Sequence, residues 1–176
     1  MEDKYLKNII TSGEAAKLAL MEKKFGKNFF HLGPDRDNSI FFEIKNNKTS
    51  LEKSDFILCT GLLSDQENDL KYYEKLLKQH ISKKLICTNP DLTVHRGDKE
   101  EYCAGKIAQI FEILGGEVIY FGKPYKEIYK MCFNDKEKVI AIGDNLRTDV
   151  KGANNVGIDS IFITDGVHRA EYKKFE

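Results

Sequence analysis

Hydrophobic and polar positions alternate in blocks along this chain, and the blocks predict strands separated by helices. In the first half, an Ala- and Leu-rich helix follows Ser12, and a second helix with one apolar stripe spans 69–82. Short apolar runs, which favour strands, lie at 29–32, 40–44 and 56–58. Turn residues such as Gly33-Pro34 separate these runs.

The pattern becomes more regular after residue 85. Strands are predicted at 85–87, 118–121, 139–142 and 161–163, and helices at 101–114, 125–133 and 148–157. Strands separated by single helices are typical of βαβ units and a parallel sheet. The sequence therefore predicts an α/β fold in two parts that join near residues 83–88.

Composition and charge narrow the function classes. Lys and Arg number 28 and Asp and Glu number 28, so the charge balance gives no argument for a nucleic-acid partner. No apolar run is long enough to span a membrane, and the first ten residues lack the apolar core of a signal peptide. The closest two cysteines, Cys87 and Cys103, lie 16 residues apart, so no C-x-x-C pair exists. We expect a cytoplasmic protein with reduced cysteines.

Three predicted strands end in polar segments: Asn89-Pro90-Asp91, Gly122-Lys123-Pro124 and Gly143-Asp144-Asn145. The carboxyl ends of parallel strands meet at one edge of a sheet, where ligands bind. Asp144 and Asp149 suit Mg²⁺, which binds through one or two carboxylates, waters and phosphate oxygens. A lysine at the same edge suits a phosphate group.

Each segment alone also fits an ordinary structural role. Asn89 is typical of an Asx turn, Lys123 of a solvated cation before a helix, and Asp149 of a helix cap. It is the ordered set of all three that favours a phosphate site.

This ordered set resembles the haloacid dehalogenase superfamily, in particular its class IIA phosphatases with an inserted cap. The resemblance implies a Rossmann-like core with an α/β cap, in which 1–85 form a cap-like part and 86–176 the C-terminal half of the core. Lys123 would stabilise the nucleophile and the transferring phosphoryl group, and Asp144 would bind Mg²⁺. The remaining site residues would hold the waters of the metal (Asn145, Asp149) or contact substrate (Asn89, Asp91).

The same resemblance implies an Asp-x-Asp nucleophile motif at the end of a central strand. The candidate here is Asp35-Arg36-Asp37, but Pro34 directly before it cannot donate to a sheet ladder. We therefore expect this segment to be a polar turn in the cap. By analogy with capped relatives, about seventy or more residues would be missing from the front.

The leading hypothesis is a magnesium-dependent phosphatase of small phosphorylated metabolites that is inactive alone because its nucleophile is absent. The alternative is a non-catalytic binding or assembly subunit, or a relic of a split gene. Such a subunit would pair its unpaired strand 139–142 with a separately encoded N-terminal fragment or with another copy of itself. A phospho-acceptor receiver domain is disfavoured, because its acids precede its lysine whereas Asp144 follows Lys123.

Overall fold

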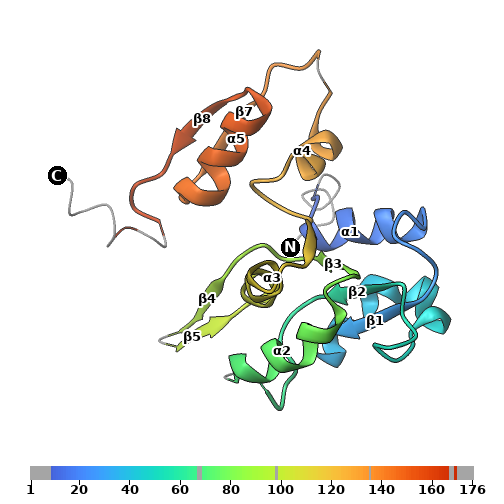
Figure 1. The fold of residues 1–176 in the computed structure, drawn as a ribbon. Coiled ribbons are helices and arrows are strands. Elements are labelled where there is room, and N and C mark those ends of the chain that lie inside the picture. Colours follow the sequence, from blue (N-terminus) through green and yellow to red (C-terminus); the bar gives the residue numbers. More distant parts are fainter. Residues whose placement is uncertain (1–8, 67–68, 98, 135, 167–168, 170–176) are drawn as a thin grey trace. The chain divides into compact units, whose positions relative to one another are not determined.

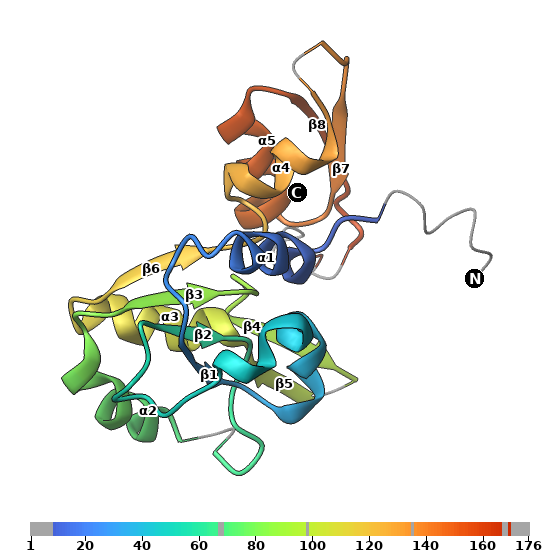
Figure 2. The same ribbon diagram turned by 90° about the vertical axis from the view of Figure 1, so that its right-hand side faces the viewer.

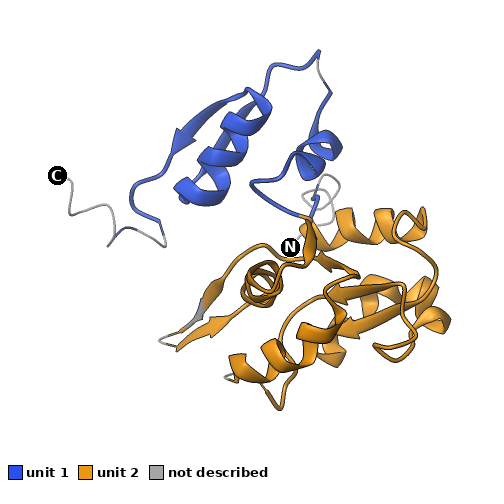
Figure 3. Cartoon of the chain, viewed as in Figure 1, with its two compact units in different colours: residues 1–11, 122–176 blue, residues 12–121 orange. Residues whose placement is uncertain are grey.

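The structure is a computed structural model that describes residues 9–66, 69–97, 99–134, 136–166 and 169. The chain forms two compact units (Figure 3). Unit 2 comprises residues 12–121, and unit 1 comprises residues 1–11 and 122–176.

Unit 2 is built on a sheet of four parallel strands in the order β1-β2-β3-β6 (Figure 1). The strands are β1 (Phe29–Leu32), β2 (Phe56–Cys59), β3 (Lys84–Cys87) and β6 (Glu117–Tyr120). All four residues of β2 are buried. A continuous apolar strand of this kind is typical of a parallel sheet covered on both faces.

Helices α2 (Leu70–Leu77) and α3 (Ala104–Ile113) cover one face of this sheet. Fully buried side chains from the two helices, including Tyr73 and Phe111, pack against Ile57 in the main hydrophobic core. The buried Tyr73 hydroxyl accepts a hydrogen bond of 2.8 Å from the Leu63 amide. Burial raises the pKa of Tyr73 to about 12.

Helix α1 (Ser12–Met21) lies on the opposite side of the sheet from α3 (Figure 2). Aromatic rings form a cluster of their own, separate from the main core. Phe29 and Phe56 have ring centroids 5.9 Å apart, and Phe41 lies 5.1 Å from Phe29. Phe56 and Ile57 point to opposite faces because side chains alternate along a strand.

The apolar run at 40–44 is not a strand, so this prediction was wrong. It lies in a 3₁₀ segment, η2 (Asp35–Asn47), which is kinked at Phe41 and Ile44. Phe41 is buried, whereas the side chain of Phe42 is 63% exposed. One buried ring anchors the segment, and the polar residues around the run do not support the alternation that a sheet strand needs.

A β-hairpin replaces the predicted start of the helix at 101–114. Strands β4 (Thr93–Arg96) and β5 (Lys99–Tyr102) pair antiparallel, and the helix begins only at Ala104. Gly97 has a φ of +63°, which suits the tight turn between the strands. The sequence prediction missed the hairpin because its strands carry mostly polar side chains.

Unit 1 contains helix α4 (Lys126–Cys132), strand β7 (Ile140–Gly143), a π-helical turn η4 (Leu146–Val150), helix α5 (Lys151–Val156) and strand β8 (Asp159–Phe162). Strands β7 and β8 pair in parallel. Helix α5 ends at Gly157, whose φ of +74° is typical of a helix C-cap. Parallel strands with intervening helices confirm the predicted α/β fold class.

The two compact units divide after Phe121 rather than near residue 85. Strand β3 is hydrogen-bonded to both β2 and β6, so the segments before and after residue 85 share one sheet. The assignment of a cap-like part, 1–85, and a core part, 86–176, stays a prediction.

Candidate functional site

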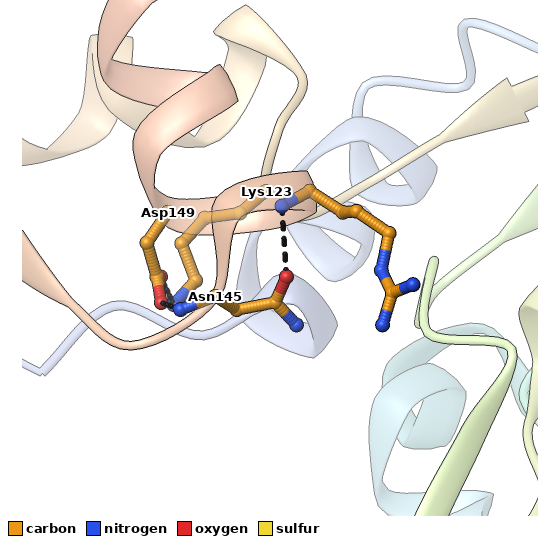
Figure 4. Close-up of polar contacts among 4 residues, drawn as sticks. Lys123, Asn145 and Asp149 are labelled. Atoms are coloured by element: carbon orange, nitrogen blue, oxygen red, sulfur yellow. Dashed lines mark hydrogen bonds and ion pairs between the residues drawn. The ribbon is translucent and has the colours of Figure 1, made fainter. Parts of the chain in front are cut away.

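The candidate site in unit 1 centres on an ion pair between Lys123 and Asp149 (Figure 4). The Lys123 ammonium donates to Asp149 Oδ1. Lys123 is the third residue after the end of β6, and Asp149 lies in η4 after β7. The Lys123 side chain is 51% exposed, whereas that of Asp149 is 11% exposed. The pair therefore presents a partly open cation whose partner carboxylate is buried.

Two neighbours hold the Asp149 carboxylate in place. The backbone amide of Asn145 donates a hydrogen bond of 3.1 Å to Asp149 Oδ2. Gly143 lies directly beside the same side chain, where an added Cβ would be 2.2 Å from Asp149 Cγ. Both carboxylate oxygens thus have a partner. The alternative that Thr148 or Asp149 is a helix N-cap is wrong, because both residues lie within η4, whose N-cap is Asn145.

Asn145 itself is the residue that caps this turn. Its side-chain oxygen accepts a hydrogen bond of 2.8 Å from the Arg147 amide. This bond satisfies one of the backbone amides at the start of η4.

Asp144 directly follows β7 and packs against Gly166. A Cβ added to Gly166 would lie 2.2 Å from both Cβ and Oδ2 of Asp144. The backbone at Gly166 therefore approaches Asp144 as closely as the backbone at Gly143 approaches Asp149.

The oxygen donors of this turn fit Mg²⁺ in kind. Asp144 supplies a carboxylate at a strand end, and Mg²⁺ commonly binds through one or two carboxylates while keeping several waters. Over the described residues, no group of three or more His, Cys, Asp or Glu side chains comes together as a metal site. Asp144 stays the candidate ligand that the resemblance names. Asp149, which has Lys123 and the Asn145 backbone amide as partners, stays a candidate for orienting the waters of the metal.

Asn89 and Asp91 lie in unit 2, after β3. The Asn89 side chain accepts a hydrogen bond of 3.1 Å from the Asp91 amide, which is the Asx-turn geometry. Asn89 therefore forms the Asx turn that was the alternative to a role in the site. Contact of Asn89 and Asp91 with substrate stays a prediction.

The Asp35-Arg36-Asp37 segment begins η2, just after β1. Strand β1 lies at the edge of the four-stranded sheet. This position agrees with the argument from Pro34, because the nucleophile motif of the resembled family follows a central strand.

The sequence prediction missed one feature of unit 2, a cavity beside the β4–β5 hairpin that Asn89 helps to line. Its walls come from five separate segments of the chain. Polar residues after each strand were the available signal, but the hairpin that closes the cavity was not predicted.

Comparisons with known proteins indicate the family. The HAD-hydrolase-like family profile matches residues 120–176, which include Lys123, Asp144 and Asp149. A haloacid dehalogenase-like hydrolase from Brucella suis 1330 superposes with a TM-score of 0.80 at 33% identity. The match covers 93% of this chain and 66% of that chain. This chain belongs to the haloacid dehalogenase superfamily.

Other relatives are phosphatases by name. The ribonucleotide monophosphatase NagD of Escherichia coli K12 is 33% identical over 88 residues, which cover 48% of this chain and 34% of NagD. An acid sugar phosphatase of Staphylococcus haemolyticus is 31% identical over 58% of this chain and 42% of its own length. The p-nitrophenyl phosphatase of Archaeoglobus fulgidus, at 19% identity and a TM-score of 0.71, shares the fold. The matches thus span less than half the length of NagD and of the acid sugar phosphatase.

Proposed function

We propose that this chain carries the lysine–aspartate part of a magnesium-dependent phosphatase site for small phosphate esters. The observation that carries the proposal is the Lys123–Asp149 ion pair, which joins the ends of two segments far apart in the sequence. The named phosphatases among the relatives support the same reaction class.

Each residue has a role that follows from its chemistry. Lys123 would neutralise the negative charge of the phosphoryl group, and Asp149 would hold the ammonium in position. Asp144 would bind Mg²⁺, with Asn145 and Asp149 orienting its waters. When bound, Mg²⁺ would polarise a phosphoryl oxygen. Asn89 and Asp91 would contact the rest of the substrate.

We further propose that these 176 residues do not turn over substrate by themselves. The sequence contains one Asp-x-Asp, at 35–37, and it follows an edge strand. The test is hydrolysis of p-nitrophenyl phosphate with Mg²⁺, comparing wild type with Asp144→Ala and Asp35→Ala. We expect no activity above background in any of them. Robust wild-type activity that Asp35→Ala abolishes would show that Asp35 is the nucleophile.

A second candidate function, assembly with a partner, is favoured by the surface of the β7–β8 sheet. Four isoleucines on these strands or directly after them are exposed: Ile140, Ile142, Ile161 and Ile163. Parallel sheets are normally covered on both faces, and two strands alone are marginally stable. The partner would be a separately encoded N-terminal fragment or a second copy of this chain.

Light scattering after size-exclusion chromatography tests this assembly. We expect the purified chain to self-associate, or to form a defined complex once the fragment is supplied. A stable monomer with a cooperative unfolding transition of both units would contradict assembly.

We place this activity in the cytoplasm. None of the four cysteines, all of which lie among the described residues, forms a disulfide bond, and three of them are buried. No helix among the described residues is long and apolar enough to cross a membrane. Small phosphorylated metabolites are the proposed substrates, and neither nucleic acid nor membrane is a proposed partner.

A further inference from the structure

Unit 2 contains a cavity of about 250 Å³ at the carboxyl ends of β1, β2 and β3. Ligands of open parallel sheets bind at this edge. The β4–β5 hairpin and the start of α3 close the cavity. Its charged and amide-bearing lining residues are Arg36, Asp37, Asn89, Lys99 and Glu101, beside the ring of Tyr102.

Close backbone packing fixes the walls of this cavity. A Cβ on Gly105 would lie 2.3 Å from the Pro90 carbonyl oxygen, so helix α3 begins directly against the turn that contains Asn89. Thr60 also lines the cavity, and its hydroxyl oxygen forms a hydrogen bond of 2.9 Å with Nε2 of His31. These contacts between distant segments fix the positions of the residues that line the cavity.

The charges that line the cavity balance. Arg36 and Lys99 are cations, and Asp37 and Glu101 are anions. Each cation has an anion beside it, because the Lys99 ammonium lies 3.6 Å from Glu101 Oε1 and Arg36 directly precedes Asp37 in the chain. Any anion that approached the cations would meet a carboxylate as well, and a zwitterion would find no end of the cavity with a single sign.

A neutral hydroxyl group matches such a lining, because it both donates and accepts. It would donate a hydrogen bond to the carboxylate of Asp37 or Glu101. It would accept one from the side chain of Arg36, Lys99 or Asn89. The apolar side chains of Leu62, Val94 and Ala104 provide surface for the carbon atoms of the ligand. The volume is slightly below the ~300 Å³ at the lower end of typical ligand sites, which limits the ligand to a small molecule.

We propose that this cavity binds a small, neutral, polyhydroxylated molecule and excludes inorganic phosphate. The cavity shares Asn89 with the proposed function, but the inference does not rest on that function, because such binding needs neither a metal nor Lys123. Asp37 and Glu101 are the residues that determine specificity, as the hydrogen-bond acceptors for the ligand hydroxyls.

The test is binding of D-ribose to the full chain, measured by saturation-transfer NMR and by titration. We expect Asp37→Asn and Glu101→Gln each to raise the Kd about tenfold, the effect of losing one hydrogen bond to a charged acceptor. The matched controls are Asp35→Asn and Glu100→Gln. Asp35 lies two residues before Asp37, and Glu100 directly precedes Glu101, but neither lines the cavity. Both control variants should therefore leave the Kd unchanged.

Three results would overturn the proposal: no ribose binding, equal weakening by the control variants, or displacement of ribose by inorganic phosphate or L-serine. A Lys123→Met variant separates this inference from the proposed function. Ribose binding should survive in that variant even if the phosphatase proposal fails, and its loss would also contradict an independent site in unit 2.

Discussion

Gly143 lies against Asp149 so closely that a Cβ at position 143 would be 2.2 Å from Asp149 Cγ. The contact places a buried carboxylate beside the end of β7. There its Oδ1 accepts a hydrogen bond from the Lys123 ammonium, and its Oδ2 accepts one from the Asn145 backbone amide. A side chain at position 143 would displace the carboxylate from both partners.

We therefore predict that Gly143→Ala destabilises the chain by about 1–3 kcal/mol, the usual cost of an overpacked site. The measurement is the free energy of unfolding in urea. In an Asp149→Gly background the steric conflict is removed, so adding Gly143→Ala should cost less there. Equal costs in the two backgrounds would show that the close contact does not determine the effect.

Loss of the Lys123 ammonium should have a small effect on stability. We predict that Lys123→Met lowers the free energy of unfolding by about 1 kcal/mol or less, because the half-exposed ammonium remains screened by water. Lys126→Met, which changes an exposed lysine at the start of α4, is the control. A much larger loss at Lys123 would mean that the pair mainly supports the fold.

Binding of Mg²⁺ should stabilise the chain if Asp144 is a ligand. A ligand that binds only the folded state raises the unfolding temperature as its concentration exceeds the Kd. We predict a rise in Tm with added Mg²⁺ that Asp144→Asn abolishes and Asp159→Asn, at an exposed position on β8, retains. A Tm rise of the same size in Asp144→Asn would exclude Asp144 as the main ligand.

His31 makes the stability depend on pH. Burial, with a smaller effect of Lys48, lowers the pKa of His31 from 6.5 to about 4. Protonation therefore favours the unfolded chain, and the stability is full above about pH 6.5 and falls as the pH drops toward 4. The loss from this group is at most about 3 kcal/mol.

Urea unfolding across this pH range measures the effect. His31→Gln should flatten the stability profile between pH 4 and 6.5, whereas His80→Gln, which changes a histidine outside the buried core, should leave the slope unchanged. An unchanged slope in His31→Gln would assign the pH dependence to other groups.

The local patterns were sufficient for most elements of the sheet and for the residues of the candidate turn. Apolar runs followed by turn residues predicted β1, β2, β3, β6 and β7. Strand β2, with all four residues buried, shows why such runs indicate a parallel sheet. The pattern located β7 as well, although Ile140 and Ile142 are exposed there. The order of Lys123 and Asp144 after two of these strands indicated the family. The hairpin 93–102 was missed because neither of its polar strands contributes to the main core.

The sequence by itself determined the α/β class, the α5 helix end at Gly157 and the chemistry available at the strand ends. These features depend on interactions between near neighbours in the chain. Only the tertiary structure decided that Lys123 meets Asp149, that Gly143 makes room for the carboxylate, and that five segments enclose a charge-balanced cavity in unit 2. Such contacts depend on how distant segments pack, which no local pattern of residues encodes.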